Sequence, residues 1–323
     1  MIVGIETTAH TFGVGVVKNG KVLANVKDMY KPLDGGIIPN KSAEHHKLVA
    51  QQIWDEALSK AGCSDSDIEA IAVSNAPGLA PCLHAGLNFA KMKATKLGVP
   101  IVPVNHCIAH LEIGQSVGAS DPVLLYASGA NTQVIAYSSG KYRVFGETLD
   151  LGVGNFIDTF GRHVGIPFPA GPVLEGKAKN GKYIPDLPYS IKGMDVSFSG
   201  MQTKLKQLYE KGVSVENLAF SMQETAFAML VEAAERALAH TGKKELVLGG
   251  GVACNARLQE MCRMMCEERG AKMFCPAREF LVDNGWMIAY TGEILFNSGI
   301  KNKPNGVEID ARERTDQVIV KWK

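Results

Sequence analysis

The chain has 323 residues, of which 46% are hydrophobic and 21% are charged, and its formal net charge at pH 7 is +1. This length predicts two domains, because one hydrophobic core seldom serves more than about 250 to 300 residues. A near-neutral charge argues against a self-sufficient nucleic-acid binder, which normally carries a basic excess over the whole domain. No apolar run reaches about 18 residues and the chain opens without a basic leader, so we expect a cytoplasmic protein with no membrane partner.

The seven cysteines include no C-x-x-C pair. An odd number in a chain too large to need disulfides indicates free, mostly buried thiols. Cys262 and Cys266 share one helix face, but the methionines around them favour core packing over metal binding.

One pattern of strands and turns occurs twice along the chain. A buried apolar strand over residues 2–5 and another over 123–126 are each followed by a turn of small residues and a second strand around Val14 or Val134. Each second strand leads into a predicted hairpin turn, Gly20-Lys21 or Gly140-Lys141. The second copy of the small-residue turn, residues 128–132, has backbone N–H groups that could bind phosphate.

A strand, glycine turn, helix and strand also occur in this order twice, which predicts parallel pairing. The two copies are strand 71–74, helix 84–96 and strand 101–104, and then strand 246–248, helix 256–269 and strand 272–274. We therefore expect two homologous α/β lobes, residues 1–118 and 119–323, with the last residues free to pack back on the first lobe. One cleft between the lobes is the expected binding site.

His106 and His110 lie four positions apart, so on a helix they face the same side and can bind one metal ion. By itself such a pair is weak evidence for a metal site. A zinc peptidase of the HExxH type needs glutamate directly after the first histidine, and this chain has Cys107 there. The sequence therefore argues against that kind of peptidase.

Six motifs strengthen the metal and nucleotide interpretation when they are taken together. They are GIETT at 4–8, APGL at 76–79, VNHCIAH at 104–110, YASGANT at 126–132, GGGVACN at 249–255 and DNG at 283–285. Together they resemble the universal tRNA threonylcarbamoyltransferase family, the TsaD and KEOPS catalytic subunits, in its archaeal and eukaryotic branch. The resemblance covers residues 2–316 and implies two duplicated lobes of the actin, Hsp70 and sugar-kinase (ASKHA) ATPase fold, with nucleotide and metal between them.

The resemblance implies that His106, His110 and Asp283 are catalytic residues that bind a metal ion, with Tyr126 as a further ligand of the archaeal type. Imidazole, phenolate and carboxylate ligands suit both Fe and Zn, so ligand type leaves the metal open. Asp283 has an alternative role as the N-cap of a helix predicted over 286–296.

The resemblance also implies an adenine-nucleotide site. Its expected residues are Ser128, Gly129 and Ala130 at the phosphates, Asp158 at the ribose, Gly171 and Glu175 beside the sugar, and Gly250, Gly251 and Asn255 around the adenine. Ordinary alternatives exist for most of them, namely tight turns, a helix face for Asp158 and an N-cap for Asn255. Ala130 departs from the family, which usually has glycine there, and its methyl group could strain a positive φ.

The family's reaction transfers threonylcarbamoyl from threonylcarbamoyl-AMP to the adenosine 3′ of a tRNA anticodon. We therefore expect one Fe or Zn ion, a bound adenine nucleotide (threonylcarbamoyl-AMP as substrate, ATP or AMP as ligand) and tRNA, with no need for DNA. A small RIO-like kinase subunit and other KEOPS subunits are expected partners that add basic surface for tRNA. His45 and His46, at the start of an amphipathic helix, are interpreted as a solvated first turn or as part of a docking surface. A sugar-kinase-type phosphotransferase and a non-catalytic ATP-binding scaffold remain as alternatives.

Overall fold

The structure is a computed structural model that describes residues 1–32 and 36–323, and these form two compact units. Unit 1 contains Met1–Ser116 and Asp283–Lys323, and unit 2 contains Val117–Val282. The expected lobes are 1–118 and 119–323 with the last residues free to pack back on the first lobe; in the structure residues 283–323 belong to unit 1 and residues 117–118 to unit 2. The reason is helix α10 (Gly285–Asn297), which packs on β1 and β2 of that unit.

Unit 1 is built on a five-stranded mixed sheet of order β3-β2-β1-β4-β5. Its first three strands are antiparallel neighbours, and β4 and β5 continue the sheet in parallel with β1. The strands are β1 (Ile2–Glu6), β2 (Thr11–Lys18), β3 (Lys21–Met29), β4 (Ala70–Ala76) and β5 (Ile101–Asn105). The helices are α1 (Pro39–Ala61), α2 (Ala80–Leu97), α3 (His106–Glu112) and α10, with short 3₁₀ helices at Asp65–Asp67, Ile113–Val117, Pro304–Gly306 and Thr315–Gln317.

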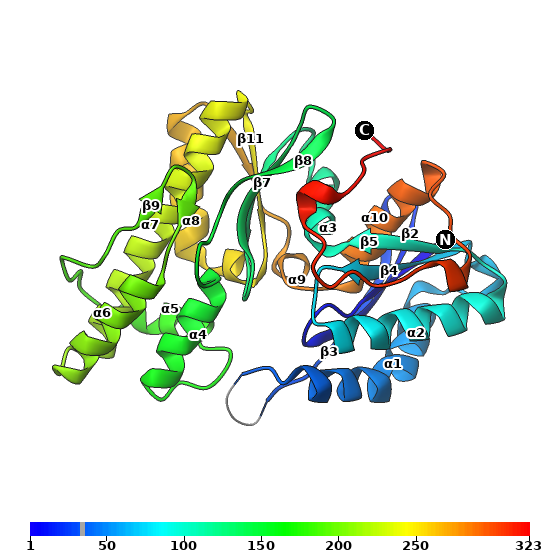
Figure 1. The fold of residues 1–323 in the computed structure, drawn as a ribbon, viewed down its shortest axis with the longest axis horizontal. Coiled ribbons are helices and arrows are strands. Elements are labelled where there is room, and N and C mark those ends of the chain that lie inside the picture. Colours follow the sequence, from blue (N-terminus) through cyan, green and yellow to red (C-terminus); the bar gives the residue numbers. More distant parts are fainter. Residues whose placement is uncertain (33–35) are drawn as a thin grey trace. The chain divides into compact units, whose positions relative to one another are not determined.

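Helices cover both faces of this sheet because successive residues of a strand point to opposite sides. Val3 and Ile5 of β1 belong to the hydrophobic core shared with α1 and α2. Gly4, between them, faces α10 so closely that a Cβ atom there would lie 2.1 Å from the backbone nitrogen of Ala289. In Figure 1, α1 and α2 accordingly lie on one side of the sheet and α10 on the other.

The hairpin turns lie one residue earlier than predicted. Asn19 and Gly20 both have positive φ angles, 52° and 72°, and so do Ser139 and Gly140, at 52° and 79°. These are the paired positive angles that tight two-residue hairpins require, which asparagine and glycine adopt readily. Lys21 and Lys141 instead begin the strands that follow each turn.

Unit 2 contains a second five-stranded mixed sheet, of order β12-β11-β6-β7-β8. Strands β6, β7 and β8 are antiparallel neighbours, and β11 and β12 continue the sheet in parallel with β6. The strands are β6 (Val123–Ala127), β7 (Thr132–Ser138), β8 (Lys141–Glu147), β11 (Glu245–Gly249) and β12 (Lys272–Phe274), with a small pair β9 (Ile191–Lys192) and β10 (Asp195–Val196). The helices are α4 (Val153–His163), α5 (Gly171–Ala178), α6 (Ser199–Glu210), α7 (Val215–Thr241), α8 (Ala256–Glu268) and α9 (Arg278–Leu281), with a 3₁₀ helix at Gly251–Cys254.

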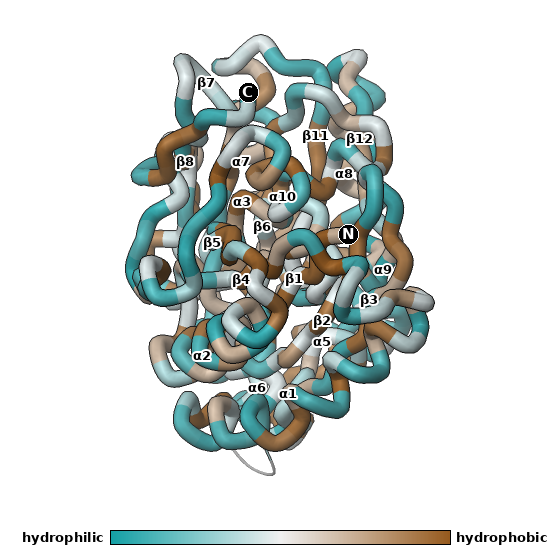
Figure 2. Tube along the Cα trace, turned by 90° about the vertical axis from the view of Figure 1, so that its right-hand side faces the viewer, coloured by the Kyte–Doolittle hydropathy of each residue, from teal (hydrophilic) through white to brown (hydrophobic). Residues whose placement is uncertain are grey.

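Helix α7 forms much of the core of unit 2. Ser214 begins it by accepting a hydrogen bond from the backbone of Asn217, and the left-handed Gly242 ends it. Surface helices such as α2 alternate between hydrophilic and hydrophobic residues along the tube in Figure 2, as amphipathic packing requires. All seven cysteines are free thiols, as predicted. Among the described residues, every helix is too short or too polar to cross a bilayer.

Candidate metal and nucleotide sites

The two histidines are placed by a short helix that starts directly at the end of β5. Asn105, the last residue of β5, caps α3 because its side-chain oxygen accepts hydrogen bonds from the backbone of Cys107 (3.0 Å) and Ile108 (3.2 Å). His106 and His110 then occupy the first and second turns on the same side. Their rings meet edge to face with centroids 4.8 Å apart.

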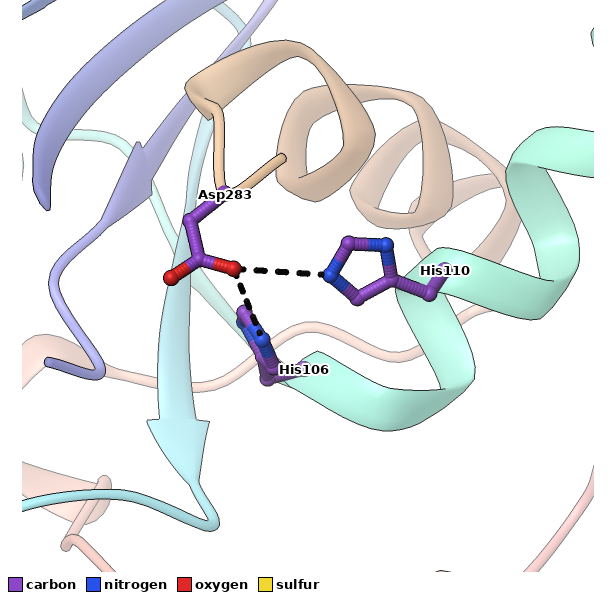
Figure 3. Close-up of side chains that lie close together, drawn as sticks. All are labelled: His106, His110 and Asp283. Atoms are coloured by element: carbon purple, nitrogen blue, oxygen red, sulfur yellow. Dashed lines mark ion pairs between the residues drawn. The ribbon is translucent and has the colours of Figure 1, made fainter. Parts of the chain in front are cut away.

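Asp283 reaches the histidines from the segment before α10, and it is not the cap of that helix. Asn284 is the cap, because its side chain accepts a hydrogen bond from the backbone of Met287 at 2.9 Å. The Asp283 carboxylate is therefore available to the histidines. One of its oxygens, Oδ1, lies 3.4 Å from Nε2 of His106 and 3.6 Å from Nε2 of His110 (Figure 3).

These three side chains fit a metal ion. Their ligand atoms all lie within 4.8 Å of one another. Metal–ligand bonds of about 2.1 Å at a tetrahedral angle separate two ligand atoms by about 3.4 Å, which agrees with the two measured distances. The side chains of His106 and His110 are 5% and 1% exposed, and that of Asp283 is 18% exposed. The site is therefore shielded but can be reached at the carboxylate.

Glu6 orients His106 from behind. The carboxylate of Glu6 is fully buried, and its Oε2 lies 2.9 Å from Nδ1 of His106. Its other oxygen accepts hydrogen bonds from the backbone (2.6 Å) and hydroxyl (2.5 Å) of Thr8. An ionised carboxylate only accepts, so Nδ1 of His106 carries a proton, and Nε2 is the nitrogen that faces Asp283 and would bind a metal ion once it loses its own proton.

Sequence reasoning did not assign Glu6 a role at the metal site. Glu6 precedes His106 by one hundred positions in the chain, and only the pairing of β1 with β4 and of β4 with β5 brings the two side chains together. No spacing rule connects them. The only sequence feature that could have indicated a role for Glu6 is its position at the end of a buried strand, before two threonines.

The electrostatics favour metal-binding protonation states. Burial alone would raise the pKa of Asp283, but the charge of His106 and hydrogen bonds from both histidines hold that pKa well below its usual range. Burial lowers the pKa of His110. The ionised form of Asp283 and the neutral form of His110, which are the forms that bind metal ions, are therefore favoured.

All the expected nucleotide residues lie in unit 2, where the small-residue turn after β6 meets the start of α4. The backbone oxygens of Ser128 and Gly129 accept hydrogen bonds from Gly154 and Asn155, both at 2.9 Å. The hydroxyl of Ser128 also closes the turn by donating to the backbone oxygen of Asn131 at 2.9 Å. The turn is therefore held to the first turn of α4.

Three polar residues of the expected site connect this turn with α5 and α8. Asp158 on α4 accepts a hydrogen bond from the backbone of Ala170 at 2.8 Å, directly before Gly171 at the start of α5. Glu175 on α5 accepts one from the backbone of Ala256 at 2.9 Å. Asn255 caps α8, so the helix-cap role weighed for it from the sequence is present.

At Gly250, the backbone of the turn before α8 lies against the backbone of the turn after β6. It has a φ of +89°, and a Cβ atom there would lie 2.3 Å from the backbone oxygen of Ala127. Gly251 has an ordinary φ, and a Cβ atom would meet nothing closer than 3.8 Å. The strain expected at Ala130 does not occur, because its φ is not positive. Hydrogen bonds and close backbone approaches thus join the segments that carry the expected nucleotide residues.

Tyr126 is buried at the end of β6 in unit 2, and its role as a metal ligand stays a prediction. The interpretation of His45 and His46 as a solvated first turn is wrong for His46, which is fully buried. Its Nε2 lies 3.0 Å from the backbone oxygen of Ala9. His45 pairs with Asp28 at 2.9 Å. The helix begins at Pro39, so both histidines fall in its second turn, where the fold covers them.

Comparison with solved structures shows the fold class. The chain aligns with HypF from Thermococcus kodakarensis at a TM-score of 0.67 and 16% identity, over 93% of this chain and 48% of HypF. It aligns with the activator of 2-hydroxyisocaproyl-CoA dehydratase from Clostridium difficile, solved with bound ADPNP, at a TM-score of 0.55 and 11% identity, over 93% and 98% of the two chains. The fold and the site thus define an α/β protein with two five-stranded mixed sheets and a candidate metal centre.

Comparison with known sequences shows the family. The family model for TsaD, tRNA N6-adenosine threonylcarbamoyltransferase, matches residues 20–290. Proteins of that name from Thermococcus kodakarensis and Thermofilum pendens are 51% and 49% identical, over 99% and 100% of this chain and 98% and 97% of theirs. A probable bifunctional tRNA threonylcarbamoyladenosine biosynthesis protein from Methanosarcina mazei is 50% identical, and the chain spans 59% of it. The chain belongs to the TsaD family and is of its archaeal type.

Proposed function

We propose that this protein is a metal-dependent tRNA threonylcarbamoyltransferase. It transfers threonylcarbamoyl from threonylcarbamoyl-AMP to N6 of the adenosine 3′ of the anticodon, position 37 of tRNAs that read ANN codons, and releases AMP. The observation that carries the proposal is the convergence of His106, His110 and Asp283, from two distant parts of a chain that belongs to this family, within 4.8 Å.

The proposed metal ligands are these three residues together with Tyr126, and the ion is Fe or Zn. A bound ion of this kind supplies a Lewis acid for the carbamoyl carbonyl or a fixed charge that orients the threonine moiety. Glu6 keeps the proton of His106 on Nδ1, away from the ligand position. Burial of both histidines excludes bulk water, which would otherwise compete for the activated carbamoyl group.

The adenylate half of the substrate is proposed to bind to unit 2. Small residues at Ser128, Gly129 and Ala130 allow the backbone to approach the phosphate, and Asp158 and Glu175 can accept hydrogen bonds from ribose hydroxyls. Gly171, Gly250, Gly251 and Asn255 would border the sugar and the adenine. The hydrogen bonds that join these segments support a preformed site, because they hold its parts together before any ligand binds.

The wider assembly follows from the same proposal. The shared strand order of the two sheets supports two duplicated lobes of the ASKHA fold. A net charge of +1 gives little attraction for tRNA, which supports a KEOPS-type complex in which a RIO-like kinase subunit and other subunits supply basic surface. Such a complex would act in the cytoplasm.

The proposal is tested by transfer of labelled threonylcarbamoyl from its adenylate to tRNA, with the candidate partner subunits present. His110→Ala should reduce transfer at least about a hundredfold and lower the metal content, because it removes a proposed ligand. His240→Ala is the matched control, since His240 is exposed in the last turn of α7. If the complete mixture binds ATP but transfers nothing, the scaffold interpretation replaces this proposal. If transfer is retained in His110→Ala, the metal site is wrong.

A further inference from the structure

The last part of unit 1, residues 308–323, contacts the helix that carries the two histidines, and we call it the strap. In Figure 1 this red segment passes beside α3 and β5. Two backbone hydrogen bonds attach the strap near the end of β4, from Asp310 to the oxygen of Asn75 (3.0 Å) and from Gly78 to the oxygen of Ala311 (3.2 Å). The strap then continues towards α3.

The strap contacts the beginning of α3 through Glu313. Its Oε2 accepts a hydrogen bond from the side-chain nitrogen of Asn105 at 2.9 Å. Asn105 is the cap of α3, and its oxygen must face the helix to accept from Cys107 and Ile108. Glu313 therefore fixes the orientation of the capping amide, because an ionised carboxylate can bond only to the nitrogen side of that amide.

The strap contacts the first turn and the end of α3 as well. Thr315, which is 2% exposed, makes a side-chain hydrogen bond with Cys107. Glu112, the last residue of α3, is fully buried, and its Oε1 accepts from the indole nitrogen of Trp322 at 3.2 Å and lies 3.3 Å from Nζ of Lys323. A buried carboxylate is costly without such partners, so these contacts hold the helix end in place.

Helix α3 needs support of this kind. It has seven residues, and so short a helix is not stable without tertiary contacts. Helix α10 packs against α3 and also follows directly after Asp283. At about 100° per residue, Glu112 lies on the opposite side of α3 from His106 and His110, so the strap braces the side that faces away from the proposed ligands.

We infer that the strap positions the metal site, with Glu313 and Trp322 as positioning residues that set the orientation of α3. The inference rests on the metal site of the proposed function. It predicts that weakening the strap lowers metal affinity, because His106 and His110 then lose their fixed orientation towards Asp283 even though every ligand is still present.

The test uses the purified protein of 323 residues and Co²⁺, whose visible absorption reports ligand number and geometry. Titrations compare wild type with Glu313→Gln, Trp322→Phe and Glu308→Gln. The last is a matched control, because Glu308 lies in the same strap with an exposed side chain and bonds Asn75 through its backbone oxygen. His110→Ala serves as the reference for loss of a ligand. Thermal unfolding is recorded for each variant, and titrations are done well below every melting temperature.

Glu313→Gln leaves only a neutral acceptor, no longer selective for the nitrogen side of the Asn105 amide, and Trp322→Phe removes the indole donor to Glu112. Each variant should therefore bind Co²⁺ about fivefold to tenfold more weakly, the effect of losing one charge-assisted hydrogen bond. The absorption bands of these two variants should shift while one equivalent of Co²⁺ still binds. The Co²⁺ affinity of Glu308→Gln should stay within about twofold of that of wild type. Equal affinity and equal spectra in the strap variants and wild type would overturn the inference. If wild type and His110→Ala bind the same amount of Co²⁺, the metal site itself is wrong and the inference falls with it.

Discussion

Oε2 of Glu6 lies 2.9 Å from Nδ1 of His106, and the two side chains are almost completely inaccessible to solvent. This contact joins the end of the first strand to the first residue of α3. It decides which nitrogen of His106 is available as a ligand, because Nδ1–H donates its hydrogen bond to the carboxylate and only Nε2 is left for a metal ion. Glu6 is thus connected to the metal site without being a proposed ligand.

Glu6→Gln should weaken metal binding by about tenfold to a hundredfold, the usual effect of removing the partner of a ligating histidine. The amide can donate as well as accept, so it no longer selects one tautomer of His106. Competitive titration with a coloured chelator measures the affinity. Glu267→Gln, an exposed site on α8, should match wild type. Unchanged affinity in Glu6→Gln would show that the tautomer is set by something else.

His46 should make the stability of the protein depend on pH. Burial outweighs its bond to Ala9 and lowers the pKa of His46 from 6.5 to about 4. As the pH falls from 6.5 to 4, the unfolded chain takes up a proton at this position that the folded chain does not, so stability falls across that window. At the low-pH end of this window, the loss of unfolding free energy due to His46 approaches about 3 kcal/mol.

His46→Gln removes this titration and keeps a donor for the oxygen of Ala9. Urea unfolding at a series of pH values should therefore show a shallower loss of stability between pH 6.5 and 4 for the variant than for wild type. Above pH 7 the two pH profiles should run parallel. Identical slopes below pH 6.5 would mean that His46 is not the group responsible.

Gly250 and Gly251 offer a matched pair of adjacent glycines. Gly250→Ala should cost roughly 2 kcal/mol or more, because a methyl group would contact the backbone of Ala127 and the φ of +89° is strained for alanine. Gly251→Ala should change stability by less than about 0.5 kcal/mol. Chemical denaturation measures both. Equal effects would contradict the close approach of Gly250 to the turn after β6.

The same pair tests the adenine site. If Gly251 borders the adenine as proposed, Gly251→Ala should weaken AMP binding at unchanged stability, which calorimetry can measure. An unchanged AMP affinity would remove Gly251 from the proposed contacts and leave the fold prediction for Gly250 untouched.

Ala130→Gly tests the expectation that a glycine suits this turn better than alanine. Since the φ of Ala130 is not positive, no strain is relieved, and the more flexible glycine should lower stability by roughly 0.5 to 1 kcal/mol. Nucleotide affinity should stay within about twofold. A more stable variant, or one with much tighter nucleotide binding, would show that the methyl group hinders the turn.

Much of the local structure was predictable from the sequence. Hydrophobic patterns located the strands, and the glycine turns indicated the parallel units, because these signals come from neighbouring residues. Boundaries were less accurate where a helix start depended on proline: α2 begins at Ala80, one turn before the predicted start, with Pro81 in its first turn. The resemblance to a family, and not periodicity, favoured Asp283 as a metal ligand over Asp283 as a helix cap.

By itself, the sequence determined the α/β class, the free thiols, the family and the pairing of His106 with His110 on one helix face, since each depends on local pattern or on recognisable motifs. Only the tertiary structure decided that Glu6 orients His106, that Asn284 rather than Asp283 caps α10, and that residues 308–323 support α3. These contacts join segments far apart in the chain. They exist because sheet pairing and helix packing bury the segments against one another, and sequence spacing does not record that burial.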